Sequence, residues 1–111
     1  MPPVNITTND IRVSVITSIL PKLTEIIAKE LTCSEWNVHK EDIKIDVVAR
    51  ASSYQSADTK IEMYAFPFEE RVKNSSKICK NIGDYMNKTC PGAGSVNVFL
   101  YLTELGYSVT K

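Results

Sequence analysis

The chain has 111 residues, of which 43% are hydrophobic and 23% are charged. These proportions are those of an ordinary globular protein and exclude a disordered or fibrous chain. The length predicts a single domain covering residues 1–111. Thirteen basic residues balance thirteen acidic ones, so charge gives no basis for nucleic-acid binding. No apolar run approaches the roughly 18 residues that cross a bilayer, and we expect no membrane span.

The three cysteines, Cys33, Cys79 and Cys90, cannot all pair within one chain. The first residues also lack the basic and apolar segments of a secretory signal. Together these features predict reduced thiols and a cytoplasmic location. The cysteine spacing fits no metal-ligand pattern, and we expect neither a metal nor a cofactor.

The first half of the chain predicts a strand, a helix and a strand. Residues 4–8 alternate apolar and polar side chains, which is typical of a strand. Apolar residues then recur every three or four positions, which predicts a helix with a bend at Pro21. They are Val13, Ile16, Leu20, Leu23, Ile27 and Leu31. Residues 43–50 alternate again and predict the second strand.

The second half repeats this order after a polar loop. Residues 60–66 alternate, and Pro67 ends that strand. A second helix begins near Glu69 and ends before the Pro-Gly-Ala-Gly segment at residues 91–94. Residues 96–102 predict the last strand. The expected apolar stripe of the second helix consists of Val72, Ser75, Cys79, Ile82 and Met86.

The two halves resemble each other. When Arg12-Val13 is placed over Arg71-Val72, the apolar stripes of the two helices coincide. The chain is therefore interpreted as two βαβ units, at residues 2–50 and 60–102.

This order of elements is compatible with two α+β folds. One is the ferredoxin-like split βαβ arrangement, and the other has two βαβ units related by a pseudo-twofold axis. Both give a four-stranded mixed sheet with two helices on one face. The other face would expose an aromatic patch larger than most monomers show, which predicts cover by a second copy of the chain. The residues expected on this face are Lys44, Asp46, Val48 and Arg50 from one strand. The four aromatic residues expected there are Tyr64, Phe66, Phe99 and Tyr101.

The Met1-Pro2 start suggests a particular chemistry. If Met1 is removed, Pro2 carries a free secondary amine, and burial lowers the pKa of such an amine. A neutral amine can act as a general base beside a carbonyl group. Cations would then hold a substrate carboxylate and stabilise an enolate oxygen. The candidates for substrate binding are Arg12, Lys44 and Arg50, each of which also fits an ordinary solvated charge, and Tyr54 in the long loop.

Taken together, these features resemble the tautomerase superfamily, which includes macrophage migration inhibitory factor and 4-oxalocrotonate tautomerase. The resemblance covers about residues 2–102, and residues 61–72 are similar to a group of bacterial tautomerase-like proteins. It implies the pseudo-twofold fold, Pro2 as catalytic base, Arg12 as a substrate-binding arginine and Lys44 in the place of a second arginine. It also implies a homotrimer with active sites between subunits, so Arg12 and Lys44 need not come from the same chain as Pro2.

Two functions remain open at this point. The first is a tautomerase or isomerase that acts on a small keto-enol carboxylic acid, with Pro2 as base. The second is a non-catalytic protein of the same fold that binds a small ligand or a partner. Pro3 favours the second, because a proline at this position hinders removal of Met1 and a retained Met1 makes the Pro2 nitrogen an amide. An unrelated ferredoxin-like module is a third reading, but residues 60–66 lack the glycine of an RNA-binding strand.

Overall fold

The computed structural model describes residues 2–50 and 57–104. The first unit consists of β1 (Pro3–Asn9), α1 (Asp10–Ser18), α2 (Leu20–Leu31), the short 3₁₀ turn η1 (Lys40–Asp42) and β2 (Lys44–Arg50). The second consists of β3 (Thr59–Ala65), α3 (Glu69–Lys73), α4 (Ser75–Thr89), the 3₁₀ turn η2 (Pro91–Ala93) and β4 (Val96–Leu102). Each predicted strand is present within one residue of its expected bounds.

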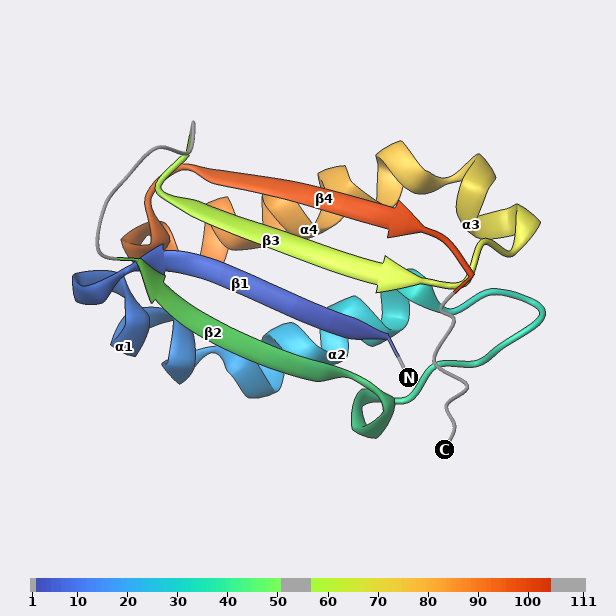
Figure 1. The fold of residues 1–111 in the computed structure, drawn as a ribbon, viewed down its shortest axis with the longest axis horizontal. Coiled ribbons are helices and arrows are strands. Elements are labelled where there is room, and N and C mark those ends of the chain that lie inside the picture. Colours follow the sequence, from blue (N-terminus) through green and yellow to red (C-terminus); the bar gives the residue numbers. More distant parts are fainter. Residues whose placement is uncertain (1, 51–56, 105–111) are drawn as a thin grey trace.

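The four strands form one mixed sheet in the order β2-β1-β3-β4 (Figure 1). The central strands β1 and β3 are antiparallel, with Val4 opposite Met63, whereas β1–β2 and β3–β4 are parallel pairs. The two strands of each unit are therefore direct neighbours. A split βαβ fold would place another strand between them, so the arrangement with two adjacent units is the one that this chain adopts.

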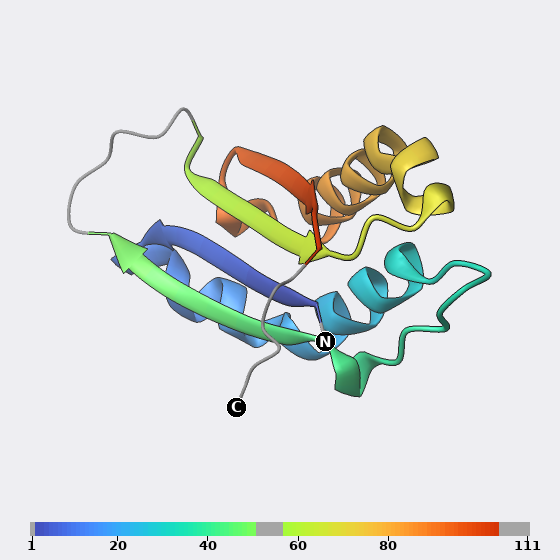
Figure 2. The same ribbon diagram turned by 45° about the vertical axis from the view of Figure 1, so that its right-hand side comes forward.

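Helices α1, α2 and α4 lie on one face of the sheet, as the two ribbon views show (Figures 1 and 2). The core forms between this layer and the sheet, where alternate strand side chains meet the apolar stripes of α2 and α4. Burial of each such aliphatic side chain contributes about 1.5–3 kcal/mol. The fully buried aliphatic side chains include Val4, Ile6, Ile61 and Met63 from the strands and Leu23, Ile27, Leu31, Ile82 and Met86 from the helices.

The first predicted helix is broken rather than bent. Helix α1 ends at Ser18 and α2 begins at Leu20, so the break lies at Ile19, just before the expected site at Pro21. Pro21 occupies the second position of α2, where a backbone N–H has no partner within the helix and its absence costs little. The proline therefore begins a new helix instead of bending a continuous one.

The second predicted helix is also divided, at Asn74, which the sequence analysis did not predict. Val72 was expected in the apolar stripe, but its side chain is 52% exposed. In α4, Ile82 and Met86 are buried as predicted, and Ile78 completes the stripe. Cys79 was interpreted as a core residue and is only half-buried. The break at Asn74 separates Val72 from the stripe of α4. Cys79 lies within α4, at the margin of the stripe beside the buried Ile78.

The sheet face away from the helices, called the open face below, exposes apolar side chains as predicted. Val48 is 51% exposed, Phe99 40% and Tyr101 41%. Phe66 lies beyond the end of β3 and packs against Phe68, with ring centroids 4.8 Å apart. None of the helices in the described ranges is long and apolar enough to cross a membrane.

Candidate functional site

Pro2 lies directly before β1 and is buried. Its neighbour Pro3 pairs with Lys44, the first residue of β2. Because β1 and β3 are antiparallel, β3 ends on this side of the sheet, where the Thr103 N–H donates to the Ala65 carbonyl at 3.0 Å. We call this region, formed by Pro2, Lys44, Ala65 and Thr103, the proline end. It combines a buried proline with an exposed lysine.

A buried arginine from α3 joins helix α2 to the connection between β3 and α3. The Nε atom of Arg71 donates to the Leu31 carbonyl at 2.8 Å, and Nη1 donates to the Phe66 carbonyl at 3.1 Å. The guanidinium carbon lies 5.0 Å from the Phe68 ring centroid and 5.5 Å from that of Trp36. These contacts fix the chain just beyond the end of β3.

Arg71 is only 1% exposed. Desolvation by burial lowers its pKa from the ordinary value, and its Nη2 atom has no hydrogen-bond partner among residues 2–50 and 57–104. The sequence alone predicts no role for Arg71, because helical periodicity treats arginine as a surface residue. The available signal was the aromatic segment from Phe66 to Phe68 immediately before it.

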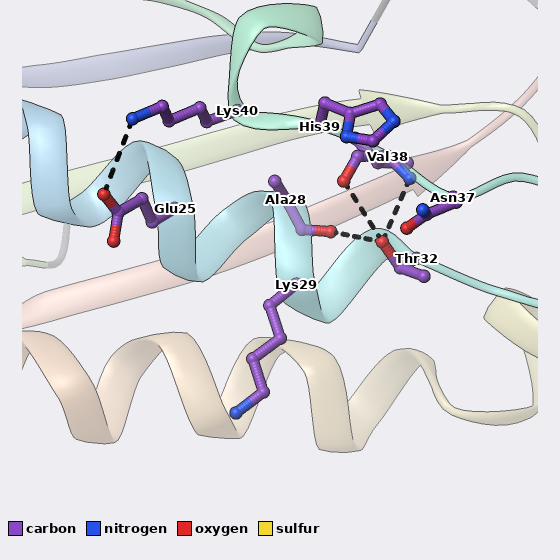
Figure 3. Close-up of a pocket in the computed structure, with 8 residues that line it drawn as sticks. All are labelled: Glu25, Ala28, Lys29, Thr32, Asn37, Val38, His39 and Lys40. Atoms are coloured by element: carbon purple, nitrogen blue, oxygen red, sulfur yellow. Dashed lines mark hydrogen bonds and ion pairs between the residues drawn. The ribbon is translucent and has the colours of Figure 1, made fainter.

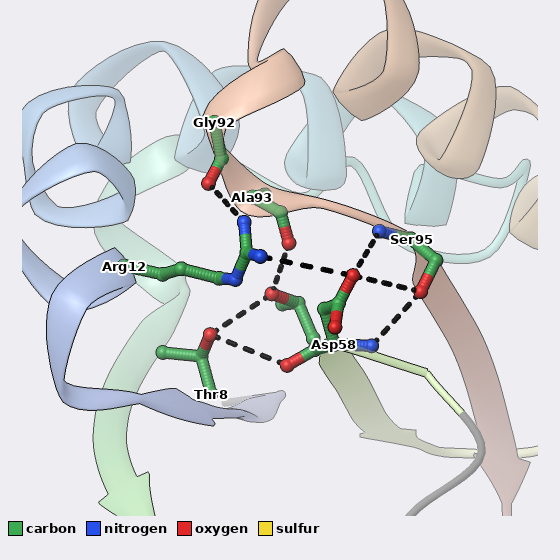
Figure 4. A network of polar contacts seen from close by, with 7 residues as sticks. Thr8, Arg12, Asp58, Gly92, Ala93 and Ser95 are labelled. Atoms are coloured by element: carbon green, nitrogen blue, oxygen red, sulfur yellow. Dashed lines mark hydrogen bonds and ion pairs between the residues drawn. The ribbon is translucent and has the colours of Figure 1, made fainter.

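The opposite end of β1 holds a network of polar contacts around Arg12 (Figure 4). Its Nη1 atom donates to the Gly92 carbonyl at 2.8 Å, and Nη2 lies 3.9 Å from Oδ2 of Asp58. Below it, the hydroxyls of Thr8 and Thr59 lie 3.0 Å apart, and Thr59 donates to the Ala93 carbonyl at 2.7 Å. Arg12 therefore connects the start of α1 with the turn before β4.

The carboxylate of Asp58 is held mainly by Ser95. The Ser95 N–H donates to Oδ2 at 3.0 Å, and the Ser95 hydroxyl lies 3.2 Å from the same atom. These hydrogen bonds, followed by a weaker effect of the Arg12 charge, place the pKa of Asp58 below its ordinary value. We call this region, formed by Thr8, Arg12, Asp58 and Ser95, the arginine end.

The predicted site residues are thus divided between the two ends of the sheet. Lys44 pairs with Pro3 at the proline end, whereas Arg50 pairs with Asn9 at the arginine end. The seven residues of β1, at about 3.3 Å each, separate the two ends by roughly 20 Å. One chain therefore does not bring Arg12 or Arg50 to Pro2. Tyr54 lies outside the described residues.

A separate groove of about 440 Å³ lies between α2 and residues 37–40 (Figure 3). Ala28 and Val38 line it, and the Thr32 hydroxyl between them donates to the Ala28 carbonyl at 2.9 Å and accepts from the Val38 N–H at 3.0 Å. Lys40 forms an ion pair with Glu25 at 3.9 Å across the same groove. These groups bind one another, and the groove does not share the residues of the proline end.

No protein-family model matches this sequence, and no curated protein matches it. Solved structures do match. A macrophage migration inhibitory factor-like protein from Entamoeba histolytica superposes with a TM-score of 0.64 over 98% of this chain and 95% of its own, at 11% identity. A protein of unknown function from Vibrio cholerae gives 0.70 over 99% and 84%, also at 11% identity. Malonate semialdehyde decarboxylase gives 0.58 over 97% and 90%, at 12% identity.

The chain has the tautomerase-superfamily fold. The resemblance recognised in the sequence is confirmed at this level, with two βαβ units around a central antiparallel strand pair. At identities of 11–12%, the similarity to these structures shows the fold alone. The chemistry has to be argued from the residues at the proline end.

Proposed function

We propose that this protein is a tautomerase or isomerase that acts on a small keto-enol carboxylic acid, with Pro2 as general base. The observation that carries the proposal is the burial of Pro2 immediately before β1 in a tautomerase fold. Once Met1 is removed, burial disfavours the protonated form of the Pro2 amine and lowers its pKa. A neutral amine near pH 7 can take a proton from the carbon beside a carbonyl group.

Lys44 is the cation of the same chain that we assign to the substrate carboxylate, because it pairs with Pro3. Its ammonium group supplies charge without the bidentate geometry of an arginine. Arg12 and Arg50 lie at the arginine end, so a contribution from either needs a neighbouring subunit. We therefore propose a homotrimer in which the arginine end of one chain approaches the proline end of another.

The malonate semialdehyde decarboxylase structures include a variant whose first-position proline is replaced by alanine. That protein and this one share the fold, and this chain has a proline at position 2, which becomes its first residue once Met1 is removed. We also place the protein in the cytoplasm, because Cys33, Cys79 and Cys90 are all free thiols, which is typical of a reducing compartment.

A non-catalytic protein that binds a small ligand or a partner is the second candidate. Two observations favour it. Pro3 follows Pro2 and hinders removal of Met1, which would leave the Pro2 nitrogen as an amide. Arg12 is already bound to the Gly92 carbonyl and lies beside Asp58, so its charge is partly used within its own chain.

The deciding experiment changes Pro3→Ala, which should release trimming of Met1 while leaving Pro2 in place. Mass spectrometry verifies the loss of one methionine, and phenylpyruvate serves as the test acid in a spectrophotometric tautomerase assay. The trimmed protein should show turnover that rises with pH as the Pro2 amine loses its proton. Pro2→Ala in the same background is the matched control and should lose most of the rate.

No turnover above buffer with fully trimmed protein, across several keto-enol acids, would refute the catalytic proposal. The non-catalytic candidate would then stand. Sedimentation equilibrium at micromolar concentration tests the trimer separately, and a monomer would refute it.

A further inference from the structure

The guanidinium of Arg12 has a partner on each of its two terminal nitrogen atoms (Figure 4). Nη1 donates to the Gly92 carbonyl at 2.8 Å, and Nη2 forms an ion pair with Oδ2 of Asp58 at 3.9 Å. The third nitrogen, Nε, is buried and has no hydrogen-bond partner among residues 2–50 and 57–104. A carboxylate from outside the chain therefore finds no pair of free, accessible donors on Arg12, and bidentate recognition requires such a pair.

Ser95 holds the Asp58 carboxylate in this position. The Ser95 N–H and hydroxyl donate to Oδ2 of Asp58 at 3.0 and 3.2 Å, and the Asp58 N–H donates to the Ser95 hydroxyl oxygen at 2.9 Å. The hydrogen bonds to the carboxylate lower the pKa of Asp58, so it is charged at neutral pH. The negative charge beside Arg12 is therefore anchored to the backbone of a different element, the segment just before β4.

Gly94 lies directly against the pair formed by Arg12 and Asp58. Its φ is +72°, and a Cβ there would lie 2.9 Å from Nη1 of Arg12 and closer still to Oδ2 of Asp58. The glycine therefore lets the backbone approach both side chains. The pair is also partly exposed, with 25% of the Arg12 side chain and 46% of the Asp58 side chain accessible. An external acid can reach Nη2 of Arg12, but it then comes close to the Asp58 carboxylate.

We propose that Asp58 is a specificity-determining residue, an internal carboxylate that occupies Arg12 and selects against substrates with a second carboxylate. The inference rests on the proposed function, because it names the acids that the proposed site accepts. Lys44, exposed on the open face at the proline end, binds the one carboxylate of the substrate. A second carboxylate directed at Arg12 meets the like charge of Asp58, and such a repulsive element excludes the wrong ligand. Arg50, at the same end as Arg12, is not free either.

Two keto acids of equal chain length isolate the effect of the second carboxylate. They are 2-oxopentanoate, with one carboxylate, and 2-oxoglutarate, with two. Isothermal titration calorimetry at constant ionic strength measures the affinity of the full chain for each acid, in the trimmed Pro3→Ala background, and needs no turnover. The parent should bind 2-oxopentanoate more tightly than 2-oxoglutarate. Asp58→Asn should raise the affinity for 2-oxoglutarate by roughly tenfold or more, which corresponds to one charge-assisted hydrogen bond, and leave that for 2-oxopentanoate unchanged.

Two further variants identify the residue through which Asp58 acts. Asparagine keeps an oxygen for the Ser95 donors, so Asp58→Asn removes the charge and preserves the shape. Asp84→Asn is the matched control, because it removes a carboxylate that pairs with Lys80 at 2.8 Å on the exposed side of α4. It should leave the ratio of the two affinities unchanged. Arg12→Gln added to Asp58→Asn should abolish the gain for 2-oxoglutarate, because that gain requires the released guanidinium.

A parent that binds 2-oxoglutarate as tightly as 2-oxopentanoate, or that binds neither acid, overturns the proposal. This comparison needs no variant and stays decisive if Asp58→Asn does not fold. A ratio unchanged by Asp58→Asn, or a gain that survives Arg12→Gln, also overturns it.

Proton exchange beside the keto group, followed by NMR in D₂O on the same samples, separates this inference from the proposed function. Tighter binding of 2-oxoglutarate to Asp58→Asn without exchange of either acid supports the role of Asp58 while the catalytic proposal fails. Equal exchange of both acids by the parent supports catalysis and overturns the role of Asp58.

Discussion

Replacing Arg71 by methionine tests whether the buried guanidinium stabilises the fold. The substitution keeps an unbranched apolar side chain between Phe68 and Trp36 but removes both hydrogen-bond donors. The carbonyls of Leu31 and Phe66, bound at 2.8 and 3.1 Å, would then lose their partner.

The magnitude follows from these two contacts. A hydrogen bond from a charged donor contributes about 1.5–3 kcal/mol, so the pair contributes about 3–6 kcal/mol. Removing the guanidinium also removes the cost of desolvating it, and this offsets part of the free energy lost with the two hydrogen bonds. We expect Arg71→Met to lower the free energy of unfolding by about 3 kcal/mol.

Urea denaturation followed by circular dichroism measures this loss. With a slope of about 1–3 kcal/mol per molar urea, the midpoint should fall by roughly 1–3 M. Parent and variants are compared at equal protein concentration, because assembly would add a concentration-dependent term. Lys73→Met changes an exposed residue of the same helix and should alter stability by less than about 0.5 kcal/mol. A loss of less than about 1 kcal/mol for Arg71→Met would refute a stabilising role of the two hydrogen bonds.

Three further predictions concern the arginine end, the glycines and the proposed site. Hydrogen bonds from Ser95 lower the pKa of Asp58, so the contribution of Asp58 to folding stability is present above about pH 4 and is lost as the pH falls through the lowered pKa. The urea midpoints of Asp58→Asn and the parent should therefore converge in acid, and a gap that stays constant with pH would contradict this. Gly94 has φ +72° and its new Cβ would collide with Asp58, so Gly94→Ala should destabilise by more than about 1 kcal/mol. In Gly83→Ala, in α4, the new Cβ would lie 3.7 Å from the Val98 side chain, an ordinary van der Waals contact, so this variant should stabilise by about 0.5–1 kcal/mol. Thermal denaturation that ranks the two variants in the reverse order would disprove the strain at Gly94. Lys44→Ala in trimmed protein should raise KM for a keto-enol acid more than it lowers kcat, and an unchanged KM would remove Lys44 from the site.

The strands could be predicted from sequence because each alternates apolar and polar side chains with period two. That period depends only on local backbone geometry, and it gave all four strands within one residue. The breaks in the helices were harder to predict from the sequence. Pro21 predicted a bend in a continuous helix, whereas the structure has a break at Ile19. Asn74 carries no comparable signal, and the assignment of Val72 to the stripe was wrong in consequence, whereas Ile82 and Met86 are buried as predicted.

The candidate site shows the same division. Pro2 and the βαβ order were sufficient to recognise the tautomerase fold, which the structural comparison confirms. The order of elements left two folds open, and the choice between them rests on strand pairing between distant residues. The role of Arg71 was also invisible, because its partners come from α2 and from the segment before its own helix.

The sequence by itself determined the strands, the apolar stripe of the first helix and the proline at the start of β1, since each depends on neighbours a few positions away. Only the tertiary structure decided that Arg50 lies at the end of β1 opposite Pro2, while Lys44 lies beside Pro3. The parallel register of β1 and β2 separates these residues. A register is set by the packing of a whole face, so no local pattern around Lys44 or Arg50 reveals which end of β1 each residue lies beside.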